Sequence, residues 1–167
     1  MRGRAAGFTM IELALVVTIL GLLVWVAYPR FETYYEVKLD AAARRVAADL
    51  RYAQNRSIGT RTAHGVLFEP ALGRYRVYAS TPATPAVDPG DPGKPLLVDF
   101  NSGGEFRGVV IESASFGSTP GVQYDYFGVP LDTARVELAS AGRVVLTCGG
   151  YADTVEVAPG TGRVAVR

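Results

Sequence analysis

An almost wholly apolar run occupies residues 8–28, near the start of the chain. As a helix its 21 residues would span about 30 Å of hydrocarbon, because an α-helix rises about 1.5 Å per residue. Arg2 and Arg4 precede the run, and no Lys or Arg lies within it. This asymmetry predicts a cytoplasmic N-terminus and an exported remainder. The pattern therefore predicts one transmembrane helix over residues 8–29 that anchors an exported domain.

Beyond Pro29 the apolar positions recur at helical spacing. Steps of three and four residues separate the main apolar members, which are Leu39, Ala43, Val46, Leu50 and Ala53. This period predicts an amphipathic helix over residues 30–58. Together with the apolar run it would give a continuous helix of about 50 residues, half in the membrane and half amphipathic.

From residue 59 onward the pattern changes from helical to β. Residues 62–68 and 74–79 flank a five-residue connection, which is typical of a hairpin. Residues 80–95 hold five of the ten prolines and are predicted to form a surface loop rather than part of the core. Further short strands are expected near residues 96–100, 109–113, 122–127, 134–138, 144–148, 154–157 and 164–166. Only an antiparallel sheet is left to cover the apolar stripe of the helix, so the sequence predicts an α+β protein with a β-rich domain over residues 59–167.

Small residues precede the apolar run rather than follow it. Ala5, Ala6 and Gly7 lie between the arginines and Phe8. An ordinary signal peptide would have a shorter apolar core and a small-residue cleavage site on its far side. Cleavage before Phe8 would instead remove a basic leader, residues 1–7, and leave the anchor attached to the domain.

Glu12 is the one charged residue inside the apolar run. A carboxylate within a membrane span costs about 2.5–3.5 kcal/mol on insertion scales, so such a residue usually has a functional partner. The alternative is a residue near the cytoplasmic interface that is protonated or reaches water, because Glu12 lies only one turn from Phe8. The residue alone leaves both interpretations open.

The segment from Gly7 to Leu13 resembles the class III leader of type IV prepilins and pseudopilins. That family has Gly, then Phe, then Thr-Leu-Ile-Glu at the start of an apolar helix, and this chain has Gly-Phe-Thr-Met-Ile-Glu-Leu. Met10 in place of the commoner Leu is conservative in size and polarity. The resemblance implies a pilin-like fold, in which a long N-terminal α-helix packs on a C-terminal antiparallel β-sheet domain.

The resemblance also implies a role for each residue of the motif. A prepilin peptidase and N-methyltransferase would cut between Gly7 and Phe8 and methylate the new Phe8 amine. Glu12 would pair with the Phe8 ammonium of a neighbouring subunit during filament assembly, since each charge would neutralise the other. Gly21 and Pro29 would bound a stretch of helix that unwinds when the subunit leaves the bilayer. A tolerated glycine and an interfacial proline are the simpler alternative for those two residues.

Later residues narrow the resemblance. The run 47–57, the first hairpin strand and residues 126–128 look like the minor pseudopilins of the GspH and FimT group. The implied function is a minor pseudopilin of a type II secretion system, which helps to initiate or tip the filament; the alternative is a minor type IV pilin in pilus biogenesis or DNA uptake. The implied partners are membrane lipid, other pilins or pseudopilins, an inner-membrane assembly platform and secreted cargo. The implied location is the bacterial inner membrane, with the domain in the periplasm, and then the filament.

DNA-binding members of that group share a C-terminal Gly-Arg-x-Arg motif. Here Gly162 and Arg163 are followed by Val-Ala, and the next arginine is Arg167, so the second arginine of the motif is missing. Arg163 and Arg167 are therefore expected to be solvated strand-edge charges rather than phosphate contacts. The chain has 17 Lys and Arg against 16 Asp and Glu, and this balance gives no general attraction to nucleic acid.

No set of residues in the sequence suggests catalysis or a cofactor. His64 is the only histidine and Cys148 the only cysteine, so neither a metal site, a nucleophile–base couple nor an internal disulfide is indicated. We expect Cys148 to be a partly buried apolar strand residue rather than a reactive or intermolecular thiol, and His64 to lie in or beside the first strand. Asp88 and Asp91 lie in an Asp-Pro-Gly repeat that favours turns over calcium ligation. The sequence therefore predicts neither an enzyme nor a metal site.

Overall fold

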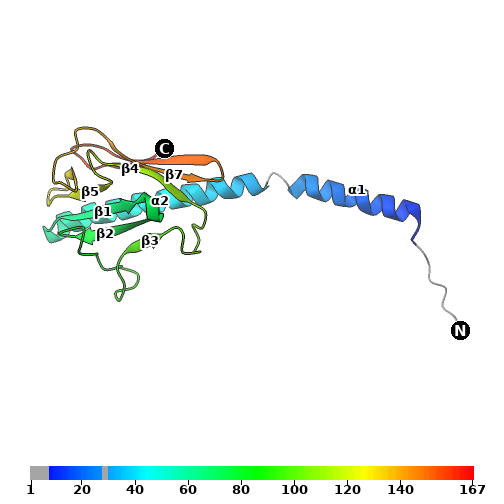
Figure 1. The fold of residues 1–167 in the computed structure, drawn as a ribbon, viewed down its shortest axis with the longest axis horizontal. Coiled ribbons are helices and arrows are strands. Elements are labelled where there is room, and N and C mark those ends of the chain that lie inside the picture. The colour runs from blue at the N-terminus through cyan, green and yellow to red at the C-terminus, as the bar shows by residue number, and fades with distance from the viewer. Residues whose placement is uncertain (1–7, 28–29) are drawn as a thin grey trace. The chain divides into compact units, whose positions relative to one another are not determined.

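The computed structural model describes residues 8–27 and 30–167 and divides the chain into two compact units, residues 1–34 and residues 35–167 (Figure 1). The basic leader and Pro29 lie outside the described residues, and so does the junction of the two predicted halves of the helix. Helix α1 spans Met10–Ala27 and helix α2 spans Arg30–Thr60.

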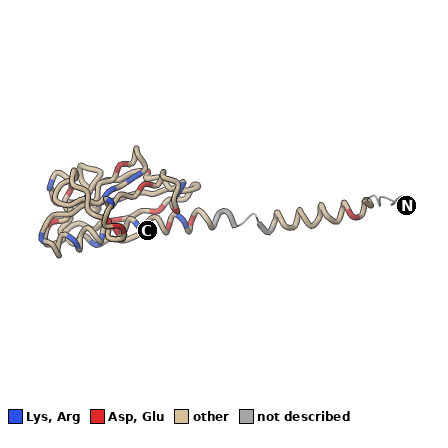
Figure 2. Tube along the Cα trace, turned by 90° about the horizontal axis from the view of Figure 1, so that it is seen from below, with Lys and Arg blue, Asp and Glu red and all other residues tan. Residues whose placement is uncertain are grey.

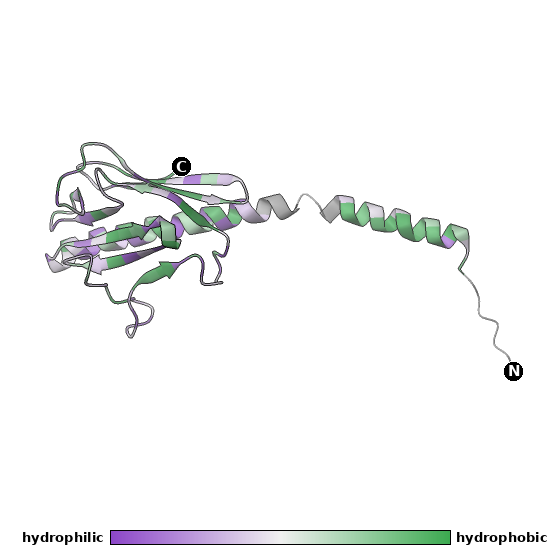
Figure 3. Cartoon of the chain, viewed as in Figure 1, coloured by the Kyte–Doolittle hydropathy of each residue, from purple (hydrophilic) through white to green (hydrophobic). Residues whose placement is uncertain are grey.

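Helix α1 is apolar on all sides. Every side chain described in residues 8–25 is exposed, from Met10 at 86% to Val16 at 45% among the large apolar ones, and Figure 3 shows the helix almost entirely in the hydrophobic colour. Neither helix, as far as its residues are described, combines the length and the apolar character that a membrane crossing needs. A helix that is hydrophobic all round has no single face to bury against a domain of its own chain.

Helix α2 is amphipathic, as its spacing predicts. All five residues of the expected stripe are at most 1% exposed, and Ala42 and Ala47 complete it. The helix ends at Thr60, two residues beyond the predicted end. Near this end the Ser57 hydroxyl donates to the Tyr124 carbonyl at 3.1 Å and accepts the His64 N–H at 2.8 Å. These bonds attach the last turns of α2 to two neighbouring strands.

Two antiparallel sheets make up the rest of the second unit. The first sheet has the order β3-β2-β1-β5-β6 and the second has the order β4-β7-β8-β9. The strands of the first sheet are β1 (His64–Glu69), β2 (Arg74–Ala79), β3 (Leu97–Asp99), β5 (Gly121–Tyr124) and β6 (Pro130–Asp132). Those of the second are β4 (Val110–Ser115), β7 (Gly142–Cys148), β8 (Tyr151–Val157) and β9 (Val164–Val166).

The predicted hairpin is confirmed. Strands β1 and β2 pair in register from His64 with Ala79 to Glu69 with Arg74. Their connection is a short 3-10 helix, Pro70–Leu72, followed by Gly73 at φ +60°, a left-handed conformation that favours glycine.

The strand predicted over residues 134–138 is wrong. The chain instead forms the earlier strand β6, which pairs with β5, and then turns back around Asp132. One carboxylate oxygen of Asp132 accepts the N–H groups of Ala134 and Val136, each at 2.9 Å, and the other accepts the Ser118 hydroxyl at 2.8 Å. A side-chain acceptor that captures the backbone in this way competes with strand pairing.

The proline-rich segment 80–95 is a surface loop with one core residue. It is largely exposed, but Ala86 is only 7% exposed and belongs to the hydrophobic core, which the sequence did not predict. Ala86 donates to the Val77 carbonyl and accepts from the Leu96 N–H at 2.9 and 2.8 Å. The loop therefore pairs with β2 next to β3 and extends that edge of the first sheet.

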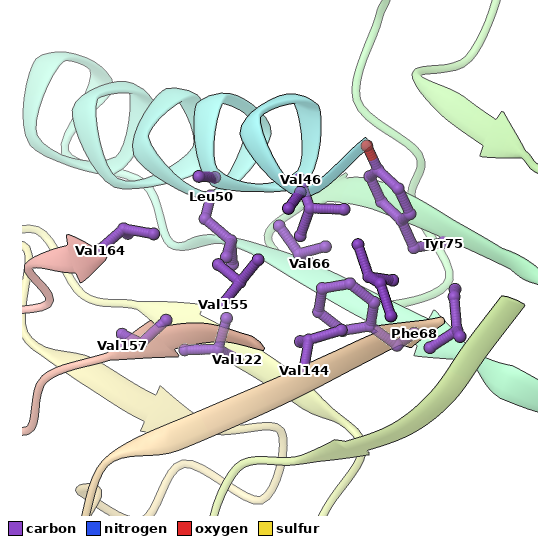
Figure 4. Packing of buried hydrophobic residues seen from close by; sticks show 14 of the residues in the cluster. Val46, Leu50, Val66, Phe68, Tyr75, Val122, Val144, Val155, Val157 and Val164 are labelled. Atoms are coloured by element: carbon purple, nitrogen blue, oxygen red, sulfur yellow. The ribbon is translucent and has the colours of Figure 1, made fainter. Parts of the chain in front are cut away.

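One hydrophobic core joins the helix to both sheets. Figure 4 shows Val46 and Leu50 of α2 pointing towards side chains of both sheets. The first sheet contributes Val66, Phe68, Tyr75 and Val122, and the second contributes Val144, Val155, Val157 and Val164. This arrangement is the predicted α+β architecture of a helix packed on antiparallel sheets.

A buried carboxylate lies between α2 and β2. Asp49 is only 6% exposed; its Oδ2 accepts the Tyr75 hydroxyl at 2.7 Å and the Arg45 Nε at 3.1 Å. Burial raises the pKa of Asp49 above its ordinary value, although both donors oppose that shift. Because the folded pKa lies above the unfolded one, the folded state binds the proton more tightly, and stability rises as the pH falls through the folded pKa.

Asp49→Asn should therefore change the pH dependence of stability. Asparagine keeps an acceptor for Tyr75 but carries no charge to desolvate, so the variant should be more stable than the native chain at pH 7. This difference in stability should shrink as the pH falls towards 4. Thermal unfolding of both chains in detergent between pH 4 and 7 measures the difference. A difference in stability that does not change with pH would contradict the raised pKa of Asp49. Tyr75→Phe, which removes the buried donor, should cost about 1–3 kcal/mol at pH 7.

Candidate functional site

The first turn of α1 holds a reciprocal set of hydrogen bonds between Thr9 and Glu12. The Glu12 carboxylate accepts from the Thr9 N–H and from the Thr9 hydroxyl, both at 3.2 Å. In return, the Thr9 hydroxyl oxygen accepts the Glu12 N–H at 3.3 Å. Thr9 is thus the residue that caps the helix, and Glu12 lies three positions later, in the arrangement known as a capping box.

This arrangement gives the charge of Glu12 a place inside an apolar helix. Two donors from Thr9 partly satisfy the carboxylate, and a negative charge in the first turn is favoured by the helix dipole. Glu12 is the only charged residue between Phe8 and Ala27, and Figure 2 shows α1 otherwise without charge. The site is therefore a single carboxylate, bonded to Thr9, on a helix whose remaining side chains are almost all apolar.

The capping residue Thr9 was missed in the sequence, where attention falls on the charge of Glu12. The signal was present, because a Thr followed three residues later by a Glu, just before an apolar run, is a known helix-start pattern.

The other predicted site residues are dispersed along the chain. Gly7 and Pro29 lie outside the described residues. Gly21 lies within α1, and a Cβ added there would meet no atom within 4 Å. Arg167 forms an ion pair with Glu156 at 3.2 Å. Arg163 follows the turn after β8 and, with Arg167, lines a surface hollow of about 420 Å³.

The residues considered for metal or catalytic chemistry lie in turns and strands of the β-rich unit. Asp88 and Asp91 accept the N–H groups of Gly90 and Gly93, at 2.7 and 3.4 Å, as expected of turn residues. His64 is the first residue of β1, as predicted. Cys148 is the last residue of β7, a strand as predicted, but it is buried more fully than the sequence predicted. Over residues 8–27 and 30–167, no group of three or more His, Cys, Asp or Glu is placed to hold a metal ion.

Comparisons with known proteins agree on one class. Residues 2–28 match the prokaryotic N-terminal methylation motif. The type IV narrow pilus major component PilA5 of Thermus thermophilus is 38% identical over 74 residues, which are 42% of this chain and 64% of PilA5. The match thus spans less than two thirds of the length of that relative.

The fold has a relative among solved structures. The type IV minor pilin FimU of Pseudomonas aeruginosa superposes with a TM-score of 0.53 at 13% sequence identity, over 79% of this chain and 90% of FimU. At that identity the likeness shows the fold alone.

The methylation motif, the identity to a pilin and the pilin fold make this chain a type IV pilin-like protein. The motif implies cleavage by a prepilin peptidase and assembly with other pilins, and it is typical of membrane-anchored subunits of extracellular filaments.

Proposed function

We propose that this protein is a minor subunit of a type IV pilus, made as a precursor and built into the filament through its N-terminal helix. The observation that carries the proposal is the exposed and almost wholly apolar α1, which lies within the segment that matches the methylation motif. Large exposed apolar surfaces mark contacts with lipid or with other chains. Lipid of the bacterial inner membrane would cover the helix before assembly, with the β-rich unit in the periplasm, and α1 helices of neighbouring subunits would cover it in the filament.

The proposed maturation step is cleavage between Gly7 and Phe8. A glycine before the cut allows the backbone to lie close to the peptidase, and the new Phe8 amine would then be methylated. Glu12 would pair with the Phe8 ammonium of a neighbouring subunit. An unpaired charge is costly in an apolar medium, so this pairing would favour entry of the helix into the filament. Gly21 and Pro29 would permit local unwinding at that step.

The two similar proteins reported above are both described as type IV pilus proteins, and this favours a pilus over a secretion system. A minor pseudopilin of a type II secretion system, with exported cargo as a partner, remains a prediction from the sequence. The GspH and FimT subgroup also remains a prediction, as do the assembly platform and DNA uptake. Both pilus and pseudopilus functions require the same processing and the same helix, so one experiment tests their shared basis.

The experiment is intact mass and N-terminal sequencing of the chain purified from cells with and without a prepilin peptidase. We expect a mature chain that starts at N-methylated Phe8 only when the peptidase is present. Gly7→Trp should block the cut, because the bulky side chain hinders entry of the backbone into the active site, whereas Gly3→Trp, the same change inside the leader, should be processed normally. Cleavage after the apolar run, or no cleavage of the native chain, would refute the proposal.

A further inference from the structure

Two neighbouring aromatic side chains are exposed to solvent at one end of the β-rich unit. Tyr126 is 55% exposed and Phe127 is 73% exposed, and their ring centroids lie 4.3 Å apart. Ile58, 48% exposed, lies beside Gly128, the residue that follows Phe127, because a Cβ added to Gly128 would come within 2.9 Å of the Ile58 Cδ1 atom. These three residues, which we call the aromatic surface, expose apolar area that solvent alone does not favour.

The loop that carries the two rings is rigidly bonded. Asp125 Oδ1 accepts the N–H groups of Phe127 and Val129, at 2.9 and 2.8 Å. The Asp125 backbone closes the turn, since its carbonyl accepts the Gly128 N–H at 3.0 Å and its N–H donates to the Val129 carbonyl at 3.1 Å. Gly128 adopts φ +84°, which few other residues adopt. A loop ordered in advance loses little entropy when a partner binds.

The same loop is tied to its two neighbours by one side chain. Gln54 of α2 donates to the Gly128 carbonyl and to the Thr161 carbonyl, both at 2.9 Å. The end of α2, the β5–β6 turn and the β8–β9 turn therefore form one continuous surface. Figure 2 shows basic positions at this end of the unit.

Charge at this end is mostly positive. Residues 51–61, 124–130 and 158–164 carry four arginines and a single carboxylate, in a chain whose total charge is +1. The four arginines are Arg51, Arg56, Arg61 and Arg163. The one carboxylate is Asp125, which is occupied by the backbone of its own turn. An aromatic centre with a basic surround fits an apolar surface bordered by acidic residues.

We propose that the aromatic surface binds a different pilin-like subunit of the same filament. The surface of that partner would be an apolar patch bordered by acidic side chains. The inference rests on the proposed function, because it names a partner of the assembled subunit. A protein fits better than a nucleic acid. The two rings are tilted by 44° against each other, so they do not form a flat platform on which successive bases could stack. Arg51 is also committed to the Val164 carbonyl at 3.0 Å.

The first test places a photo-activated crosslinking residue at position 127 of the full-length chain in cells that assemble filaments. The expected product is a covalent adduct with a different pilin-like subunit, at a peptide rich in Asp or Glu. The same crosslinking residue at position 136, where Val136 is 61% exposed, serves as the matched control and should not give this adduct. Adducts only with nucleic acid, only with copies of this chain, or with nothing would overturn the proposal.

The second test measures binding of the full-length chain, in detergent, to each purified pilin-like subunit of the same cells. Phe127→Ser should weaken binding to the crosslinked subunit at least tenfold. Arg163→Glu and 0.5 M NaCl should weaken it by about threefold or more, as expected of charge pairs near a surface. Val136→Ser should leave it unchanged. Equal binding by Phe127→Ser and the native chain would overturn the docking surface.

Filament composition separates the two proposals. If the native chain is processed and found in filaments but Phe127→Ser is incorporated equally well, the docking inference fails and the proposed function stands. If the native chain never enters filaments, the proposed function fails, whatever the binding assay shows.

Discussion

Glu12→Gln should leave leader cleavage intact and reduce incorporation into filaments at least tenfold. Glutamine is also found at the third position of capping boxes, so its side-chain oxygen should keep the bonds that Glu12 receives from the Thr9 N–H and hydroxyl. It carries no charge, however, and cannot neutralise the Phe8 ammonium of a neighbour. Quantitative immunoblotting of sheared filaments, normalised to the mature chain in membranes, measures the effect.

Two companion variants separate capping from charge pairing. Glu12→Ala loses both functions and should assemble no better than Glu12→Gln. Thr9→Val loses the capping hydroxyl but keeps the carboxylate, so it should assemble at a level closer to that of the native chain. Capping residues contribute about 0.5–2 kcal/mol to helix stability, which is less than the cost of about 2.5–3.5 kcal/mol for an unpaired carboxylate in a membrane span. Normal assembly of Glu12→Gln would show that capping, and not charge, is what the filament needs.

Gly65→Ala should destabilise the β-rich unit by about 1–3 kcal/mol or more, the range found for overpacked cores. A Cβ at this position would collide with the Val122 carbonyl oxygen and would lie 2.5 Å from the Cζ and Oη atoms of Tyr78. Gly65 pairs with Tyr78 on β2, and Tyr78 is fully buried. Neither neighbour can move without opening the first sheet.

Gly104→Ala is the matched control, because a Cβ there would meet no atom within 4 Å and its φ is not in the left-handed region. It should leave the unfolding temperature nearly unchanged. The two variants are compared by thermal unfolding of the full chain in detergent, with the abundance of mature chain in cells as a second measure. Equal unfolding temperatures for Gly65→Ala and the native chain would contradict the tight packing of β1 against β2 and β5.

The parts of the fold that the sequence predicted are those with a local physical cause. The stripe from Leu39 to Ala53 could be recognised because one helix face is buried along its whole length. The hairpin at residues 69–73 followed from a proline and a glycine between two alternating segments. In both cases the residues that specify the structure are neighbours in the chain.

The parts that were missed depend on contacts between distant residues. Asp132 turns the chain back with the help of Ser118, so residues 134–138 do not become a strand despite their composition. Ala86 is buried only because the loop that holds it pairs with Val77. The division of the short strands of residues 64–166 among two sheets is likewise decided by pairing partners that no local pattern identifies.

The candidate site divides in the same way. Gly7, Phe8 and Glu12 belong to one short motif, so their roles, which stay predictions, could be inferred without any tertiary contact. The exposed rings of Tyr126 and Phe127 could not be distinguished from core residues in the sequence, because aromatic side chains beside a strand are more often buried. Their exposure depends on how Asp125 closes the turn.

The capping box of α1 gives the helix a start signal that is independent of the leader. Thr9 and Glu12 both lie after the proposed cut, and none of their mutual hydrogen bonds involves a residue before it. Precursor and mature chain would therefore begin their helix at the same residue, without refolding at the moment of cleavage. The proposed leader would then need to act only as a recognition tag, and leaders could be exchanged between precursors without changing the helix that the peptidase releases.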